Sequence, residues 1–176
     1  YLELSSINPV FILPGALAER SEEIAGEFSG SCLMGTGQFC TNPGMVILLA
    51  GENTDAFVAS VSEQFSAAPV GTFLSEAVQK SFLSGISALK DAGGEAGGGC
   101  GFSSQNTLLK VDGASFLENP EALQAEAFGN GSLFVIAADA AQAEQIAESL
   151  EGNLTGCIYS ATDGSDDTIY DQIAPA

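Results

Sequence analysis

The chain has 176 residues, of which 45% are apolar and 15% are charged, so it can bury the core of one globular domain. Its 23 acidic residues, 4 basic residues and lack of His give a formal net charge of -19. Nucleic acids and anionic membranes are bound through Lys and Arg, so these counts argue against a nucleic acid or a membrane as the partner.

The absence of His narrows the chemistry that the chain can perform. It excludes Ser-His and Cys-His dyads and His-based metal sites, so we expect no metal. The Cys residues form no CxxC motif or regular framework and are typical of reduced cytosolic thiols. No membrane-length apolar run and no signal peptide is visible, which predicts a cytoplasmic location.

Apolar runs and segments with helical spacing alternate along the chain. The predicted strands cover residues 8–13, 45–50, 108–111, 132–137 and 154–159. The predicted helices cover residues 18–34, 54–65 (with Thr54 as N-cap), 75–91, 140–150 and 165–173. This alternation predicts an α/β fold, a mostly parallel twisted sheet flanked by helices, without an internal domain boundary.

Two glycine-containing segments separate these elements. Residues 93–101 fit neither a dinucleotide-binding nor a P-loop pattern, so we interpret residues 92–101 as a surface connector. Residues 35–44 form a predicted loop between a helix and a buried strand. Among the cysteines, Cys32 and Cys157 fall in predicted elements and read as small core residues, whereas Cys100 falls in the connector.

Cys40 differs because it lies in the loop, within the sequence Gly-Gln-Phe-Cys-Thr-Asn-Pro-Gly. Loops at strand ends are where α/β proteins place their sites, and nearby backbone N–H groups can stabilise a thiolate or an oxyanion. The spacing alone leaves two readings open, a structural cysteine and a catalytic one.

Two carboxylates also precede predicted strands. Glu3 stands among apolar residues, where it is either a partly desolvated general base or a solvated strand end. Glu126, in the sequence Glu-Ala-Phe-Gly, is either an acceptor for ligand hydroxyls or a turn residue.

Together these three segments resemble the catalytic-domain motifs of the NAD(P)-dependent aldehyde dehydrogenase superfamily. Glu3-Leu-Ser-Ser is similar to the family's Glu-Leu-Gly-Gly motif, Gly37-Gln-Phe-Cys to Gly-Gln-x-Cys, and Glu126-Ala-Phe-Gly to Glu-x-Phe-Gly-Pro. Cys40 follows Glu3 by 37 residues and precedes Glu126 by 86, which resembles the family spacing. The sequences around these motifs, Ser-Ser-Ile-Asn-Pro-Val-Phe and Gln-Phe-Cys-Thr-Asn-Pro-Gly, resemble those of the 2,5-dioxovalerate (α-ketoglutarate semialdehyde) and NADP-dependent fatty aldehyde dehydrogenases.

The resemblance implies a role for each motif. Cys40 would attack the aldehyde to form a thiohemiacetal and then a thioester, with its backbone N–H as one oxyanion donor. Glu3 would activate water for hydrolysis, Glu126 would bind the nicotinamide-ribose hydroxyls of NADP or NAD, and Phe128 would pack near the nicotinamide. The resemblance also implies that the intact enzyme, of which this chain would be one part, is a cytoplasmic homo-oligomer that oxidises an aldehyde to a carboxylate.

Three departures qualify what the resemblance implies. Ser5-Ser6 replaces Gly-Gly and Asn130 replaces the usual Pro, and nothing corresponds to the family's nucleotide-binding domain or its pairing strand. We therefore expect residues 1–176 to be a single catalytic domain, a fragment that self-associates and has little or no turnover on its own. The alternative is an acidic non-catalytic binding or scaffold module of the same fold.

Overall fold

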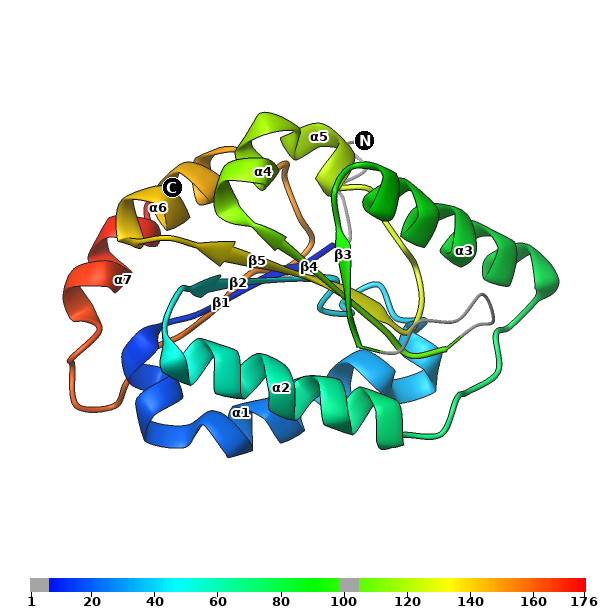
Figure 1. Ribbon diagram of the computed structural model, residues 1–176, viewed down its shortest axis with the longest axis horizontal. Helices are drawn as coiled ribbons and strands as arrows, with labels where there is room; N and C mark the ends of the chain where they lie inside the picture. The colour runs from blue at the N-terminus through cyan, green and yellow to red at the C-terminus, as the bar shows by residue number, and fades with distance from the viewer. Residues whose placement is uncertain (1–6, 99–104) are drawn as a thin grey trace.

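The computed structural model describes residues 7–98 and 105–176, and it contains a sheet between two layers of helices (Figure 1). The strands run in the order β3-β4-β5-β2-β1-β6. All neighbouring strands are parallel except the pair formed by β3 and β4. The strands are β1 (Pro9–Ile12), β2 (Met45–Leu49), β3 (Glu95–Gly98), β4 (Thr107–Asp112), β5 (Gly131–Ala137) and β6 (Cys157–Tyr159).

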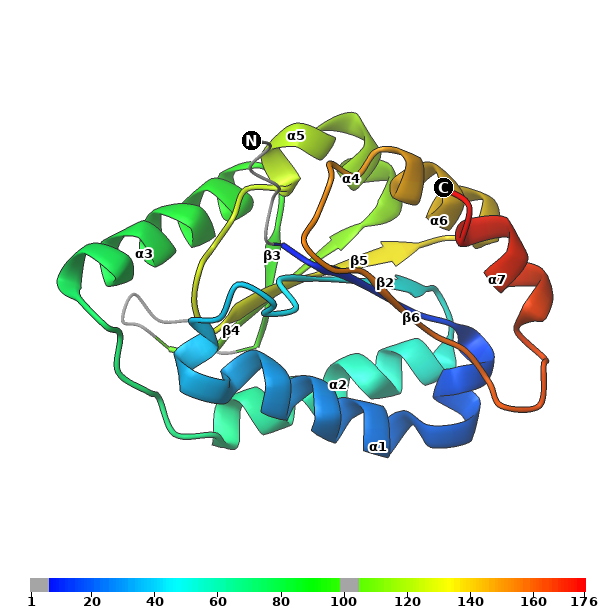
Figure 2. The same ribbon diagram turned by 180° about the vertical axis from the view of Figure 1, so that it is seen from behind.

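The helices confirm the predicted α/β class. Helices α1 and α2 cover one face of the sheet, and α3, α4, α5 and α6 cover the other (Figures 1 and 2). The helical elements are α1 (Pro14–Leu33), the short 3-10 helix η1 (Met34–Gly37), α2 (Glu52–Ala67), α3 (Glu76–Asp91), α4 (Gly113–Glu118), α5 (Pro120–Leu123), α6 (Ala140–Glu148) and α7 (Asp167–Ile173).

The central strand β2 shows why the sheet requires helices on both faces. All five of its side chains are buried, and successive side chains point to opposite faces. Ile47 therefore packs in the core beneath α3 to α7, whereas Val46 packs in the core formed with α1 and α2. Stacked and edge-on rings strengthen the second core, namely those of Phe28, Phe57, Phe65 and Phe134.

Two helix starts differ from the prediction. Helix α2 begins at Glu52 after Gly51, and the Thr54 hydroxyl donates to the Leu49 carbonyl, so Thr54 is not its N-cap. Helix α1 begins at Pro14, four residues earlier than predicted, because Pro suits the first turn of a helix. The Ser75 hydroxyl accepts from Val78 N–H at 3.2 Å, which confirms the predicted start of α3.

The interpretation of residues 92–101 as a connector is wrong in part. Residues 95–98 form β3, an edge strand in which Glu95 pairs with Lys110, and residues 99–101 lie outside the described residues. The partner strand supplies the hydrogen bonds that the glycine-rich composition does not reveal. Helices α4 and α5 were not predicted, and each is one or two turns long.

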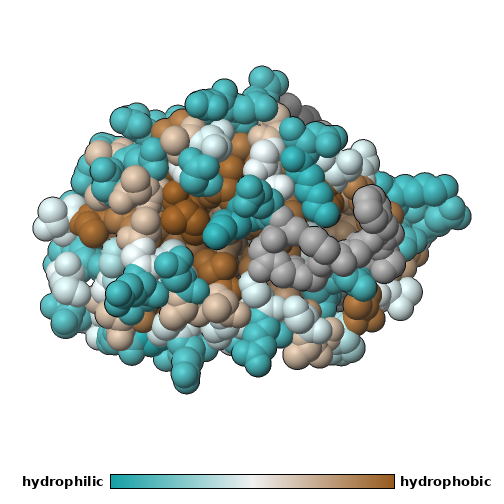
Figure 3. Space-filling view, in the orientation of Figure 1, coloured by the Kyte–Doolittle hydropathy of each residue, from teal (hydrophilic) through white to brown (hydrophobic). Residues whose placement is uncertain are grey.

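The surface is mixed in polarity. In the orientation of Figure 1, hydrophilic residues lie mainly around the periphery and apolar residues show between the helical layers (Figure 3). The exposed large apolar residues include Met34, Phe39, Val70 and Leu74. None of the helices in residues 7–98 and 105–176 is long and apolar enough to cross a membrane.

Candidate active site

The parallel sheet brings segments that are distant in the sequence together at the amino ends of its strands. Strands β5, β2 and β1 are parallel neighbours, with Met45 of β2 paired to Pro9 of β1 and to Leu133 of β5. The segments that precede these strands, residues 7–8, 38–44 and 125–130, therefore meet at the amino ends of the strands. Open α/β sheets more often bind ligands at the carboxyl ends of their strands, so this candidate site lies at the opposite ends of the strands from the usual position.

Cys40 lies in a tight turn at these amino ends of the strands. The Phe39 carbonyl accepts from Asn42 N–H at 3.0 Å, which leaves Cys40 and Thr41 as the two central residues. The Cys40 side chain is exposed, and its backbone carbonyl accepts from the Asn8 side-chain amide at 2.9 Å. Within residues 7–98 and 105–176, the Cys40 N–H has no hydrogen-bond partner. The turn therefore exposes Cys40 and leaves its N–H without a partner among the described residues.

Gln38 connects this turn to the linker between α2 and α3. Its side-chain nitrogen donates to the carbonyls of Gly35 at 2.9 Å and Thr72 at 3.2 Å. Its side-chain oxygen accepts from Leu74 N–H at 2.7 Å. Gln38, two residues before Cys40, therefore connects the two segments through hydrogen bonds and is not a proton-transfer group.

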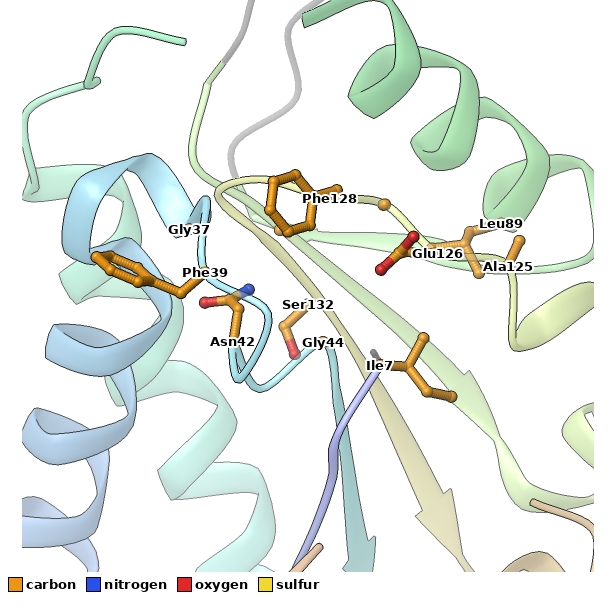
Figure 4. A pocket seen from close by; sticks show the side chains of 12 residues that line it. Ile7, Gly37, Phe39, Asn42, Gly44, Leu89, Ala125, Glu126, Phe128 and Ser132 are labelled. Atoms are coloured by element: carbon orange, nitrogen blue, oxygen red, sulfur yellow. The ribbon is translucent and has the colours of Figure 1, made fainter. Parts of the chain in front are cut away.

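The second candidate segment carries Glu126 and Phe128, and it forms one rim of a small open hollow. Figure 4 shows these two residues facing the segment that carries Phe39 and Asn42. The Asn42 side-chain amide donates to the Gly129 carbonyl at 3.3 Å and so joins the two segments. The structure thus brings Glu126 and Phe128 to the same strand ends as the Cys40 turn.

Two polar atoms of this hollow are buried without a hydrogen-bond partner among the described residues. They are Asn42 Oδ1 and Ser132 Oγ, whose side chains are 7% and 3% exposed. Buried polar atoms normally have partners, so this pair indicates room for a polar ligand group or water. Phe39 and Asn42 line the hollow, whereas the exposed Cys40 side chain is not among its lining residues.

Glu3, the predicted general base, lies outside the described residues. The prediction of its role therefore stays a prediction. Among residues 7–98 and 105–176, no group of three or more His, Cys, Asp or Glu side chains is arranged to hold a metal ion.

Asn8, at the same amino ends of the strands, was not predicted as a site residue. It is 2% exposed and has a positive φ of 47°, a conformation that Asn tolerates better than most residues. Its side-chain nitrogen donates to the carbonyls of both Cys40 and Asn42 at 2.9 Å. An Asn-Pro pair before a buried strand was the available signal, because such pairs favour turns.

The cysteines other than Cys40 have different environments. Cys32 is fully buried, and burial raises its pKa to about 12. Cys157 lies exposed on the edge strand β6, so its prediction as a core residue is wrong, although partial burial raises the pKa of its thiol. Cys100 lies outside the described residues.

The buried Cys32 thiol predicts a loss of stability in alkali. Its folded pKa of about 12 exceeds the ordinary 9.0, so above about pH 9 the unfolded chain loses a proton that the folded protein keeps. The free energy of unfolding should then fall by up to about 1.4 kcal/mol per pH unit until the folded pKa is reached. Urea unfolding followed by circular dichroism at about pH 8 and pH 10.5 measures this slope.

The matched control for this slope is Cys32→Ala, which removes the thiol from the same site. Other alkaline titrations affect both proteins, so the difference between their slopes belongs to Cys32. Equal slopes in the two proteins would contradict the prediction.

Comparison with known proteins places these features in a family, although no protein-family model matches the chain. Over 169 residues the chain is 35% identical to alpha-ketoglutaric semialdehyde dehydrogenase 2 of Azospirillum brasilense, covering 93% of this chain and 32% of the relative. It is 34% identical to alpha-ketoglutaric semialdehyde dehydrogenase of Acinetobacter baylyi, covering 91% of this chain and 32% of that relative. The chain thus spans about a third of the length of these curated relatives.

The fold agrees with this sequence similarity. The structure matches that of an NAD-dependent benzaldehyde dehydrogenase from Corynebacterium glutamicum with a TM-score of 0.75. That match has 18% identity and covers 98% of this chain and 38% of the other. The chain is therefore related in sequence to the alpha-ketoglutaric semialdehyde dehydrogenases, and it shares its fold with part of an aldehyde dehydrogenase structure.

Proposed function

We propose that residues 1–176 act as the catalytic domain of an enzyme that oxidises an aldehyde to a carboxylate. The observation that carries the proposal is the tight turn that exposes the Cys40 thiol beside the hollow lined by Glu126 and Phe128. The relatives' names support a semialdehyde as substrate, and a fatty aldehyde is the other candidate.

Cys40 performs the covalent chemistry in this proposal. Its thiolate attacks the aldehyde carbon, a carbon–sulfur bond forms, and the carbonyl oxygen becomes an oxyanion in a thiohemiacetal. The Cys40 N–H, which has no partner among the described residues, is the proposed donor to that oxyanion. After oxidation to a thioester, water attacks the carbonyl carbon, the carbon–sulfur bond breaks and the thiolate is released.

Glu3 is the proposed base for the hydrolytic step. It takes the proton from the attacking water, and the products are the carboxylate and the free Cys40 thiolate. This assignment rests on the resemblance of its motif, since Glu3 lies outside the described residues.

We assign the nicotinamide end of NAD or NADP to the hollow beside the turn, because of the groups that line it. Glu126 supplies a carboxylate that can accept hydrogen bonds from ribose hydroxyls, and Phe128 supplies an aromatic ring. The unpartnered Asn42 Oδ1 and Ser132 Oγ supply further polar positions in the same hollow. When bound, the cofactor accepts the two electrons and the hydrogen that the thiohemiacetal carbon loses.

Cysteine alkylation tests the assignment of Cys40. With iodoacetamide near pH 8, we expect Cys40 to react first, Cys157 to react more slowly because burial raises the pKa of its thiol, and Cys32 to react only after unfolding. Peptide mapping by mass spectrometry gives the rate at all four cysteines, and Cys40→Ser confirms the assignment of the fastest one. A rate at Cys40 no greater than the rate at Cys100 would favour the non-catalytic acidic module.

A further inference from the structure

We propose that Asn8 is a positioning residue that aims the backbone N–H of Cys40 at the oxyanion of the bound carbonyl. The inference rests on the proposed role of Cys40 as the nucleophile. It concerns a residue that lies 32 positions from Cys40 in the sequence and whose side-chain amide donates to the Cys40 carbonyl.

The two peptide planes that flank the Cys40 α-carbon are both held by hydrogen bonds. The Phe39 carbonyl accepts from Asn42 N–H at 3.0 Å, and the Cys40 carbonyl accepts from Asn8 Nδ2 at 2.9 Å. The described residues contain no cis peptide bond, and a trans peptide is planar, so each N–H points opposite to its carbonyl. The Cys40 N–H therefore points out of the turn, away from the carbonyl that Asn42 holds.

Asn8 acts on both planes. Its amide nitrogen binds the Cys40 carbonyl directly, and it also binds the Asn42 carbonyl at 2.9 Å. Asn42 in turn holds the Phe39 carbonyl through its own N–H. The Asn8 side chain thus holds the peptide plane after Cys40 directly, and through the Asn42 carbonyl it holds the residue whose N–H fixes the plane that contains the Cys40 N–H.

Asn8 is itself held from the opposite side. Its side-chain oxygen accepts from the backbone N–H and the hydroxyl of Thr155, both at 3.2 Å, and its backbone N–H donates to Asn153 Oδ1 at 3.0 Å. These bonds fix which end of the amide faces Cys40, because the two donors of Thr155 require an acceptor. An Asp side chain would keep the acceptor for Thr155 but would place a second oxygen against the carbonyls of Cys40 and Asn42.

Two variants separate the effect of losing the Asn8 amide donor from the effect of changing the backbone conformation at position 8. Asn8→Asp preserves the shape and the Thr155 contact but removes the amide donor. Asn8→Gly tolerates the positive φ and removes the side chain altogether. Thr155→Val is the matched control, because it removes only the hydroxyl bond to Asn8 Oδ1, while the backbone N–H of residue 155 still donates to that oxygen and keeps the amide donor facing Cys40.

Two reactions of Cys40 distinguish a change in the direction of the Cys40 N–H from a general loss of order in the turn. Acylation by p-nitrophenyl acetate forms a sulfur–carbon bond and an oxyanion, after which p-nitrophenolate leaves. Alkylation by iodoacetamide forms a sulfur–carbon bond and expels iodide, without an oxyanion. A misdirected Cys40 N–H therefore slows only the first reaction.

The experiment measures both rate constants at Cys40 in the 176-residue chain near pH 8, with Cys40→Ser as the blank. The loss of an oxyanion donor costs up to about 10²- to 10³-fold, so we expect the acylation-to-alkylation ratio to fall at least about tenfold in both Asn8 variants. Thr155→Val should keep the wild-type ratio. An unchanged ratio in folded Asn8→Asp or Asn8→Gly, or an equal fall in Thr155→Val, would overturn the proposal.

The same measurements distinguish a failure of the proposed function from a failure of the positioning role of Asn8. If the wild-type chain shows no Cys40-dependent acylation, Cys40 is not the nucleophile and both proposals are overturned. If acylation is normal and independent of Asn8, only the positioning role is overturned. Amide hydrogen exchange at Asn42 gives an independent check, because the Asn42 N–H should exchange faster in both Asn8 variants and not in Thr155→Val.

Discussion

Gly37→Ala is expected to lower the free energy of unfolding by about 2 to 5 kcal/mol and to move the Cys40 turn away from its neighbour. Gly37 has a positive φ of 65°, and a Cβ at this position would overlap the backbone carbonyl of Gly129. The left-handed conformation costs an L-residue about 1 to 2 kcal/mol, and overpacking costs about 1 to 3 kcal/mol more. The turn and the Glu126 segment meet at this contact, so the change disturbs the candidate site directly.

Two glycines serve as controls for this prediction, measured by urea unfolding. Gly93 has a positive φ of 116° but open space around its would-be Cβ, so Gly93→Ala shows the backbone cost alone. Gly26 lies in α1 with nothing within 4 Å of its would-be Cβ, so Gly26→Ala should stabilise the protein by about 0.5 to 1 kcal/mol. If Gly37→Ala costs no more than Gly93→Ala, the close contact with Gly129 does not constrain the turn.

Asp166→Ala is expected to destabilise the protein by at least about 3 kcal/mol, because it leaves three backbone N–H groups without their acceptor. The Asp166 side chain is 2% exposed. Its carboxylate accepts from Gly15 N–H at 2.8 Å and from the N–H groups of Ala16 and Ala161, each at 2.9 Å. Gly15 and Ala16 belong to the first turn of α1, so the carboxylate also lies at the positive end of that helix.

The size of this effect is checked by urea unfolding with two related variants. Asp166→Asn keeps one oxygen acceptor and should lose less stability than Asp166→Ala. Asp112→Ala removes the same charge from an exposed residue that caps the short helix α4, and it should cost only about 1 kcal/mol. A loss at Asp166→Ala no larger than that at Asp112→Ala would show that the three contacts do not stabilise the fold.

The fold was predictable from residue patterns because its strands are buried on both faces. Continuous apolar runs such as residues 45–50 and 132–137 indicated parallel strands, and the helical stripe beginning at Ser75 indicated α3. Residues 95–98 could not be predicted as a strand, because their pairing with β4 rather than their composition makes them extended. The short helices α4 and α5 lack the length that a helical periodicity requires.

The candidate site was predictable only in part. The motifs around Cys40 and Glu126 pointed to the two segments that the structure places together, and Asn42 and Gly37 join those segments at Gly129. Cys157 was assigned to the core because an apolar strand pattern does not distinguish a central strand from an edge strand such as β6.

The sequence by itself determined the α/β class, the acidic surface and the motifs that carry a thiol and a carboxylate, because these depend on composition and local spacing. Only the tertiary structure decided that Asn8 holds the Cys40 turn and that Asp166 holds the start of α1. Both roles consist of hydrogen bonds between a side chain and the backbone of a distant segment: the Asn8 amide donates, whereas the Asp166 carboxylate accepts. Such bonds leave no periodic signal in the sequence, since they depend on which segments the parallel sheet brings together.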